Sequence, residues 1–232
     1  MNAEGWKRAF LKSLPVMAGY LVMGAGFGIL FRVSGYGPVW ALGMSVFLYA
    51  GSMQFVGISL LTSGASVITV AVTTLLVQAR HLFYGLSLID RYKGAGFKKL
   101  YMIHAITDET YSLVCSTEAP KGVKPHAFYF AISLLDHIYW IAGCVLGNLI
   151  GGFLSFDTTG LDFAMTALFV TIFVEQWQST KEHRPAILGA VLALMCLVLF
   201  GAENFLIPAM FAITLGLTAL WKPLEKGVRS DG

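Results

Sequence analysis

Charged side chains are almost missing from the first third of the chain. Between positions 13 and 79 the 67 residues include one charged side chain, Arg32. A soluble domain of this size must present charged and polar residues to water on its outer faces, whereas about 20 apolar residues suffice to cross the hydrocarbon core as a helix. The stretch therefore excludes an ordinary soluble domain and predicts several membrane segments.

The sequence also lacks the signatures of the common enzyme and cofactor classes. Its three cysteines stand alone in apolar sequence, with neither a disulfide framework nor a zinc spacing. There is no Walker motif, dinucleotide fingerprint, G-x-S-x-G or H-E-x-x-H run. His81, His104 and His137 with Asp136 form a conceivable metal site, but no two histidines stand four residues apart. We predict a protein that is no enzyme and has no cofactor, no bound metal and, with a net charge of only +3, no nucleic-acid partner.

Apolar sequence dominates what is present. Hydrophobic residues make up 56% of the 232 positions and charged residues 12%, which is far from the composition of soluble proteins. We predict an all-α polytopic membrane protein that forms one domain over 1–232, with about six to eight transmembrane segments. The first apolar run is too long for the core of a cleaved signal and is read as a retained helix. The apolar segments are 14–32, 37–62, 66–90, 100–117, 127–152, 161–180, 185–202 and 204–221.

The distribution of lysine and arginine sets the expected orientation. The basic N-terminus, the 181–184 loop and the tail should all be cytoplasmic. If all eight segments cross, however, the most basic loop, 91–99, lies on the opposite side. The conflict disappears if 37–62 and 100–117 are re-entrant hairpins that return to the side from which they enter. Eight full crossings remain the alternative.

Both of these segments are interrupted by small and polar residues. The interruptions lie at 49–54 and 106–110, and broken backbone at membrane depth is tolerated only where it is buried in protein or lines a cavity. A faint internal repeat matches 52–54 with 107–109 and 80–84 with 136–140. In the hairpin topology these repeats are inverted, which is typical of secondary transporters.

Two neighbouring polar residues, Arg80 and His81, stand near mid-depth in the third apolar segment. An arginine at the centre of a bilayer costs about 2.5–3.5 kcal/mol on insertion scales, so its side chain should face a partner or water. We expect Arg80 to bind a carboxylate, and a structural ion pair between Arg80 and Asp136 or Asp108 is the alternative.

Asp136 and His137 stand at a similar depth in the segment 127–152. A carboxylate beside an imidazole can take up and release protons near neutral pH, and a fixed salt bridge from Asp136 to Arg80 is the alternative. The other candidates lie at the interruptions or beside this pair, where ordinary interhelical packing or a solvated loop would also explain them. The predicted substrate-binding residues are Arg80, His81, Gln54, Asp108, Tyr139 and Trp140, and the predicted proton-coupling residues are Asp136, His137 and Glu109.

Four runs of the sequence resemble the AzlC family of bacterial branched-chain amino acid permeases. They are YAGSMQF at 49–55, QARHLFYGLS at 78–87, TDETY at 107–111 and EQW at 175–177, and the likeness extends over nearly the whole chain. The resemblance implies a link to azaleucine resistance and to the export of valine, leucine and isoleucine. It also implies a second component, a small AzlD-like membrane subunit.

Together, the residues and the resemblance predict a secondary transporter of the bacterial inner membrane that exports branched-chain or similar apolar amino acids. Because no nucleotide-binding motif is present, coupling to protons or another ion is expected. A transporter for a different small zwitterion is one alternative. A non-transporting scaffold or sensor subunit is the other, although a scaffold has no use for charge at membrane depth.

Overall fold

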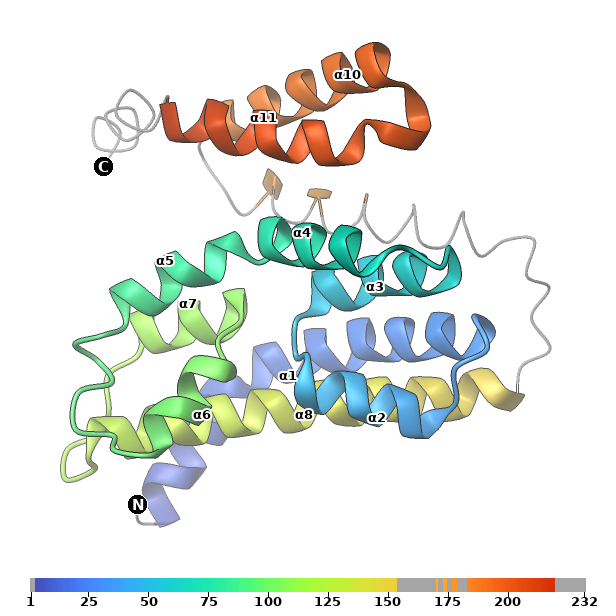
Figure 1. The fold of residues 1–232 in the computed structure, drawn as a ribbon. Helices are drawn as coiled ribbons and strands as arrows, with labels where there is room; N and C mark the ends of the chain where they lie inside the picture. The colour runs from blue at the N-terminus through green and yellow to red at the C-terminus, as the bar shows by residue number, and fades with distance from the viewer. Residues whose placement is uncertain (1–2, 154–169, 171–172, 175–176, 179–182, 220–232) are drawn as a thin grey trace. The chain divides into compact units, whose positions relative to one another are not determined.

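The computed structural model describes residues 3–153, 170, 173–174, 177–178 and 183–219, and within them every regular element is a helix. The expected all-α class is therefore confirmed. Two compact units are present, the first formed by 1–66 with 77–161 and the second by 67–76 with 162–232. The helices are α1 (Ala3–Val33), α2 (Pro38–Phe47), α3 (Gly51–Thr62), α4 (Val67–Val77), α5 (Ala79–Ser87), α6 (Lys98–His104), α7 (Asp108–Ser116), α8 (Pro125–Phe153), α10 (Arg184–Asn204) and α11 (Leu206–Ala219) (Figure 1).

Three of these helices are long and apolar enough to cross a membrane. They are α1, α8 and the stretch Arg184–Gly201 of α10, which match three of the predicted segments. Most of the predicted segment 161–180 lies outside the described residues. The predicted segment 66–90 is divided at Gln78 into α4 and α5, because the helix is interrupted where the apolar run gives way to the polar run that begins at this residue.

Helices α1 and α8 run in the same direction and touch backbone to backbone. A Cβ added at Gly28 would lie 2.1 Å from the carbonyl oxygen of Cys144, and one added at Gly147 would lie 2.2 Å from that of Ala25. Small residues permit such close approach between membrane helices. Van der Waals packing drives the association of helices there, because lipid removes the hydrophobic effect that drives it in water. This interface is the most extensive between helices in the described part of the chain.

The segment 37–62 is a hairpin of α2 and α3, as its interruption predicted. At its base Asn148 of α8 donates to the carbonyl oxygen of Tyr36, and at its tip the Tyr49 ring stacks on His137 of α8. Helix α3 then returns, so that Gly57 faces Met44 of α2 across the hairpin. The first hairpin therefore extends from the C-terminal part of α8 to its middle (Figure 1).

The segment 100–117 is a second hairpin, made of α6 and α7, and it approaches from the other end of α8. Near its base the Lys98 ammonium lies 5.0 Å from the centre of the Phe130 ring. At its tip Thr110 donates to Asp136 of α8, and α7 then returns toward the start of α8. The tips of the two hairpins thus meet near the middle of α8, where His104 lies 3.2 Å from the carbonyl oxygen of Val46.

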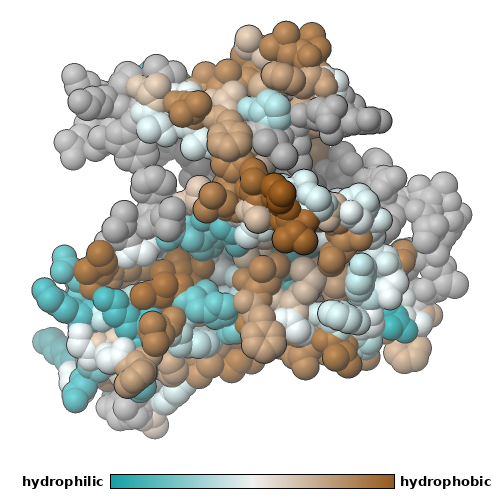
Figure 2. All heavy atoms as spheres, in the orientation of Figure 1, coloured by the Kyte–Doolittle hydropathy of each residue, from teal (hydrophilic) through white to brown (hydrophobic). Residues whose placement is uncertain are grey.

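The loop between α5 and α6 lies at the same end of the first unit as the N-terminus. One buried cluster joins Ala9 of α1, Tyr92 of the loop, Met102 of α6 and Phe128 of α8. Burial raises the pKa of Tyr92 to about 12, so its hydroxyl stays neutral. Figure 2 shows hydrophilic residues gathered at this end, on the left of the view. The arrangement is the one that the hairpin topology requires.

In the second unit, α10 and α11 pack against each other. The chain bends at Gly201, whose φ of +74° is a left-handed conformation that glycine adopts without strain. A Cβ added at Gly216 of α11 would lie 2.9 Å from the Leu192 side chain of α10, so this interface is also close.

Candidate functional site

A buried group of polar side chains, here called the central polar cluster, occupies the place where the two hairpin tips meet α1 and α8. Polar groups at membrane depth are expensive and mark substrate or ion pathways. The side chains of Gln54 and Asp136 within it are 0% exposed. The cluster comprises Tyr20 of α1, Tyr49 and Gln54 of the first hairpin, Thr107, Glu109 and Thr110 of the second, and Asp136, His137 and Trp140 of α8.

Trp140 fixes the orientation of the Gln54 amide. The indole Nε1 donates to Oε1 of Gln54 at 2.6 Å. Since an indole N–H can only donate, the carbonyl oxygen of the amide must face Trp140 and the amino group must point elsewhere. Among the described residues no atom accepts a hydrogen bond from that Nε2. The amino group of Gln54 is therefore a buried donor of fixed orientation that has no acceptor in the described structure. Such an atom is called unfilled below.

Asp136 has a hydrogen-bond donor at only one of its two carboxylate oxygens. Its Oδ2 accepts from the Thr110 hydroxyl at 2.8 Å, while no described atom donates to its Oδ1. Thr110 stands in the first turn of α7, where its backbone N–H donates to the hydroxyl of the N-cap residue Thr107. The capped helix end therefore holds Thr110 against the carboxylate and leaves the second oxygen as an unfilled acceptor.

Tyr20 ties α1 to the tip of the second hairpin. Its hydroxyl donates to Oε2 of Glu109 at 2.8 Å and shares a hydrogen bond with the Thr107 hydroxyl. Both partners belong to the first turn of α7 or to its cap. The carboxylate of Glu109 is therefore held next to the N-terminus of α7, whose partial positive charge favours a carboxylate.

His137 joins both hairpins to α8. Its Nε2 lies 3.1 Å from the carbonyl oxygen of Ser45, which can only accept, so this nitrogen donates. Its Nδ1 lies 2.9 Å from the Tyr101 hydroxyl and accepts from it in the neutral ring. The Tyr49 ring stacks over the imidazole at 4.1 Å, although Tyr49 itself has a strained φ of +36°. Strain at the hairpin tip is thus held by contacts with α8.

The structure places the other predicted site residues outside these contacts. The Tyr139 hydroxyl lies 3.2 Å from Ser13 of α1, and Asp108 is half-buried in the first turn of α7. His81 contacts the Tyr84 ring within α5, with the centres 5.7 Å apart. The Arg80 side chain lies outside the described part of the structure. Of the predicted site residues, the structure brings together Gln54, Glu109, Asp136, His137 and Trp140.

The predicted site residues do not include four members of the cluster, namely Tyr20, Tyr49, Thr107 and Thr110. Tyr20 is a polar aromatic residue in a glycine-rich apolar run, which is only a weak signal. Tyr49 and Thr110 each belong to a predicted interruption, yet nothing local distinguishes a hydroxyl that reaches α8 from one that caps its own helix.

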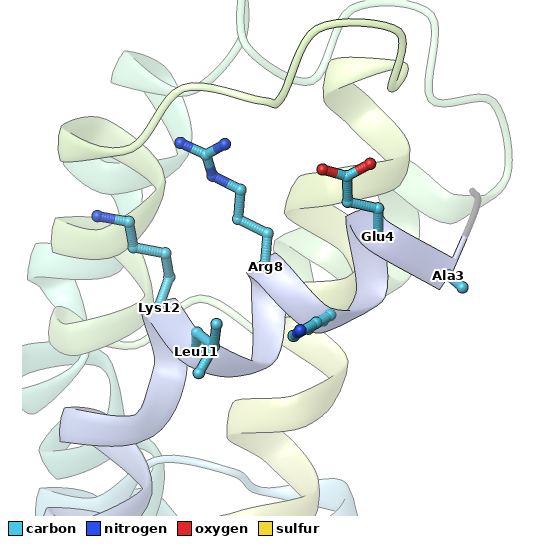
Figure 3. Close-up of a pocket in the computed structure, with 6 residues that line it drawn as sticks. Ala3, Glu4, Arg8, Leu11 and Lys12 are labelled. Carbon is cyan, nitrogen blue, oxygen red and sulfur yellow. The ribbon is translucent and has the colours of Figure 1, made fainter.

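A surface pocket of about 770 Å³ lies apart from the central polar cluster, on the first turns of α1 (Figure 3). Figure 3 shows Arg8 and Lys12 extending on one side of the helix, with Glu4 one turn away. These basic residues form the charged end of α1. No group of three or more histidine, cysteine, aspartate or glutamate side chains among the described residues is placed to hold a metal ion.

The family model described as AzlC protein matches residues 15–154, which include both hairpins and the central polar cluster. The chain belongs to the AzlC family. The branched-chain amino acid transport protein AzlC of Bacillus subtilis is 43% identical over 95% of this chain and 87% of its own length. A Helicobacter pylori protein named an uncharacterized membrane protein is 45% identical over 96% of this chain and 97% of its own length.

A more distant relative is the Escherichia coli inner membrane protein YgaZ, which is 26% identical over 94% of this chain and 91% of its own length. No solved structure is significantly similar to the chain. The AzlC relationship and the apolar helices make this chain a membrane protein, and the name of the Bacillus subtilis relative favours a transport role over catalysis.

Proposed function

We propose that this AzlC-family protein is a secondary transporter of branched-chain amino acids in the bacterial inner membrane. The observation that carries the proposal is the meeting of two broken-helix hairpins, one from each end of α8, at a buried polar cluster with unfilled hydrogen-bonding atoms. Opposed hairpins whose tips meet at mid-depth are a recurrent way to hold a small ion or substrate between two sides of a membrane. The printed name of the Bacillus subtilis relative supports the substrate class.

The proposed mechanism has protons as the coupling ion and export as the direction. Asp136 is the buried carboxylate best placed to carry a proton, because one of its oxygens has no donor among the described residues. Outward transport is proposed because the family resemblance implies azaleucine resistance, which removal of the compound from the cytoplasm would provide. The basic N-terminus and the 91–99 loop are proposed to be cytoplasmic, and a small AzlD-like subunit is the proposed partner.

Purified protein in liposomes tests the function directly. Labelled leucine should leave vesicles loaded with it when an inward proton gradient is imposed, and the flux should need the small subunit. Asp136→Asn should abolish the response to the gradient, whereas Asp90→Asn, at a side chain that is 91% exposed, should behave as wild type. Leucine flux that is absent with and without the partner, from protein that remains folded, would reject the proposal.

A further inference from the structure

Three buried atoms of the central polar cluster have no hydrogen-bond partner among the described residues, namely the Tyr49 hydroxyl, Nε2 of Gln54 and Oδ1 of Asp136. A hydroxyl can donate or accept, whereas the other two atoms are opposite in kind. Nε2 of Gln54 is a donor without an acceptor, and Oδ1 of Asp136 is an acceptor without a donor, and both are fully buried in the described structure. A buried polar atom left without a partner is destabilising, so few are retained unless something else fills them. An α-amino acid offers both missing groups, a carboxylate that accepts and an ammonium that donates.

Both Gln54 Nε2 and Asp136 Oδ1 belong to side chains that are held at one face of α8. Asp136 and Trp140 are four residues apart on one face of α8, about 6 Å along its axis, and Trp140 holds Gln54 by its Oε1. A single ligand that fills both atoms must therefore carry an acceptor and a donor as neighbouring groups. The ammonium and the carboxylate of an α-amino acid are such neighbours, since both are attached to the α-carbon.

The two helix N-termini at the hairpin tips differ in the charge they already carry. Helix α7 is capped by Thr107 and has Asp108 and Glu109 in its first turn. Helix α3 begins after Ala50, has no side-chain cap and has no acidic residue in its first turn. The N-terminus of a helix favours a negatively charged group. The N-terminus of α7 already has two carboxylates beside it, whereas the N-terminus of α3 has none. Gln54, in this first turn, aims its unfilled donor from the same place.

We propose that the central polar cluster binds the amino acid in one orientation, with its α-carboxylate on Gln54 at the N-terminus of α3 and its ammonium on Oδ1 of Asp136. This assignment rests on the proposed function and specifies its site. Both atoms are buried, so the described conformation is closed, and the substrate reaches the cluster when a hairpin tip moves away from α8.

Two isosteric substitutions change only the unfilled atoms. Gln54→Glu keeps an oxygen for Trp140 and replaces the unfilled donor by an acceptor. Asp136→Asn keeps an oxygen for Thr110 and replaces the unfilled acceptor by a donor. Because the filled hydrogen bonds survive, both variants should fold, which size-exclusion chromatography in detergent checks. Asp90→Asn, on the surface, is the matched control for loss of a carboxylate.

Binding to the purified protein is measured by competition against labelled leucine. The competitors are 3-methylbutylamine, which is leucine without its carboxylate, and 4-methylpentanoate, which is leucine without its ammonium. Gln54→Glu should weaken leucine and 4-methylpentanoate about tenfold to a hundredfold, as expected for loss of a charge-assisted hydrogen bond, and should spare the amine. Asp136→Asn should weaken leucine and the amine by a similar factor and spare 4-methylpentanoate.

Trp140→Phe supplies an independent check, because it removes the N–H that orients the amide. It should weaken leucine and 4-methylpentanoate severalfold and leave the amine unchanged. The contrary results are equal weakening of all three compounds by each folded variant, or weakening of the amine by Gln54→Glu and of 4-methylpentanoate by Asp136→Asn. Either result would overturn the proposed orientation of the substrate, but not the proposed function in leucine transport. No binding of leucine by the wild-type protein, with its partner present, would overturn both the proposed function and the assignment.

Discussion

Replacing Gly28 by alanine should separate α1 from α8. The added Cβ would lie 2.1 Å from the Cys144 carbonyl oxygen and 2.5 Å from the Asn148 backbone nitrogen, whereas real Cβ contacts are essentially never under 3.0 Å. The helices must therefore part by about 0.9 Å, because the atoms in the way are backbone and have no rotamer to adopt. Overpacking of this kind costs about 1–3 kcal/mol.

A hydrogen bond is lost in addition. Asn148 donates from Nδ2 to the carbonyl oxygen of Gly28 at 3.2 Å, and such a bond contributes about 0.5–1.5 kcal/mol. The free energy of unfolding should therefore fall by about 1.5–4.5 kcal/mol. The matched control is Gly26→Ala, two residues away in the same helix, where no described atom lies within 4 Å of the added Cβ. It should leave stability unchanged or raise it by about 0.5–1 kcal/mol, because glycine disfavours a helix.

The assay is equilibrium unfolding in mixed micelles of a mild detergent and SDS, followed by tryptophan fluorescence. Gly28→Ala should unfold at a clearly lower SDS fraction than wild type, and Gly26→Ala should not. If both variants unfold together, the backbone contact between α1 and α8 does not hold the first unit together, and the reasoning is wrong.

Three further predictions concern the ends of the hairpins and the partner. Arg91 donates to two carbonyl oxygens at the end of α7 and to a hydroxyl on α8, so Arg91→Gln should lower the unfolding free energy by about 2–3 kcal/mol in the same assay, and an unchanged midpoint would contradict this. Gly94→Cys, in a background without native cysteines, should resist an impermeant thiol reagent in intact cells, and ready labelling would instead favour eight crossings. Tolerance of high valine should appear in cells that express this chain with its AzlD-like partner, and full tolerance without the partner would remove the claim that one is needed.

The two hairpins were predictable from the sequence because their breaks leave a local trace. Glycine, serine and threonine interrupt apolar runs at 49–54 and 106–110, and the basic residues of 91–99 give the expected direction of return. The break at Gln78 was not predicted, since 66–90 was interpreted as one segment although a polar run begins at this residue. Local composition shows where a membrane helix is disfavoured, and only tertiary contacts decide which weak point becomes a turn.

The partners within the central polar cluster could not be read from the chain. Trp140 bonds a residue 86 positions away, and Tyr20 bonds Glu109 at a separation of 89. Tyr139 and Trp140 are neighbours in sequence and both were predicted to line the site, yet a step of about 100° around α8 turns one toward Ser13 of α1 and the other toward Gln54. Helical periodicity predicts that adjacent side chains face different ways, but not which of them faces the site.

The unequal ways in which the first unit is held together indicate which of its parts can move. Helices α1 and α8 interlock along a glycine-lined backbone interface, so sliding or parting them disturbs close contacts along their length. Each hairpin tip instead meets α8 through a few directed bonds, to Gln54 and Ser45 in the first hairpin and to Tyr101 and Thr110 in the second. Such bonds contribute only about 1 kcal/mol each when water or a substrate can replace them. We therefore expect the central polar cluster to open at the hairpin tips, one hairpin at a time, while the α1–α8 pair stays fixed. Because the hairpins come from opposite ends of α8, movement of each tip should open the cluster toward a different end of the helix.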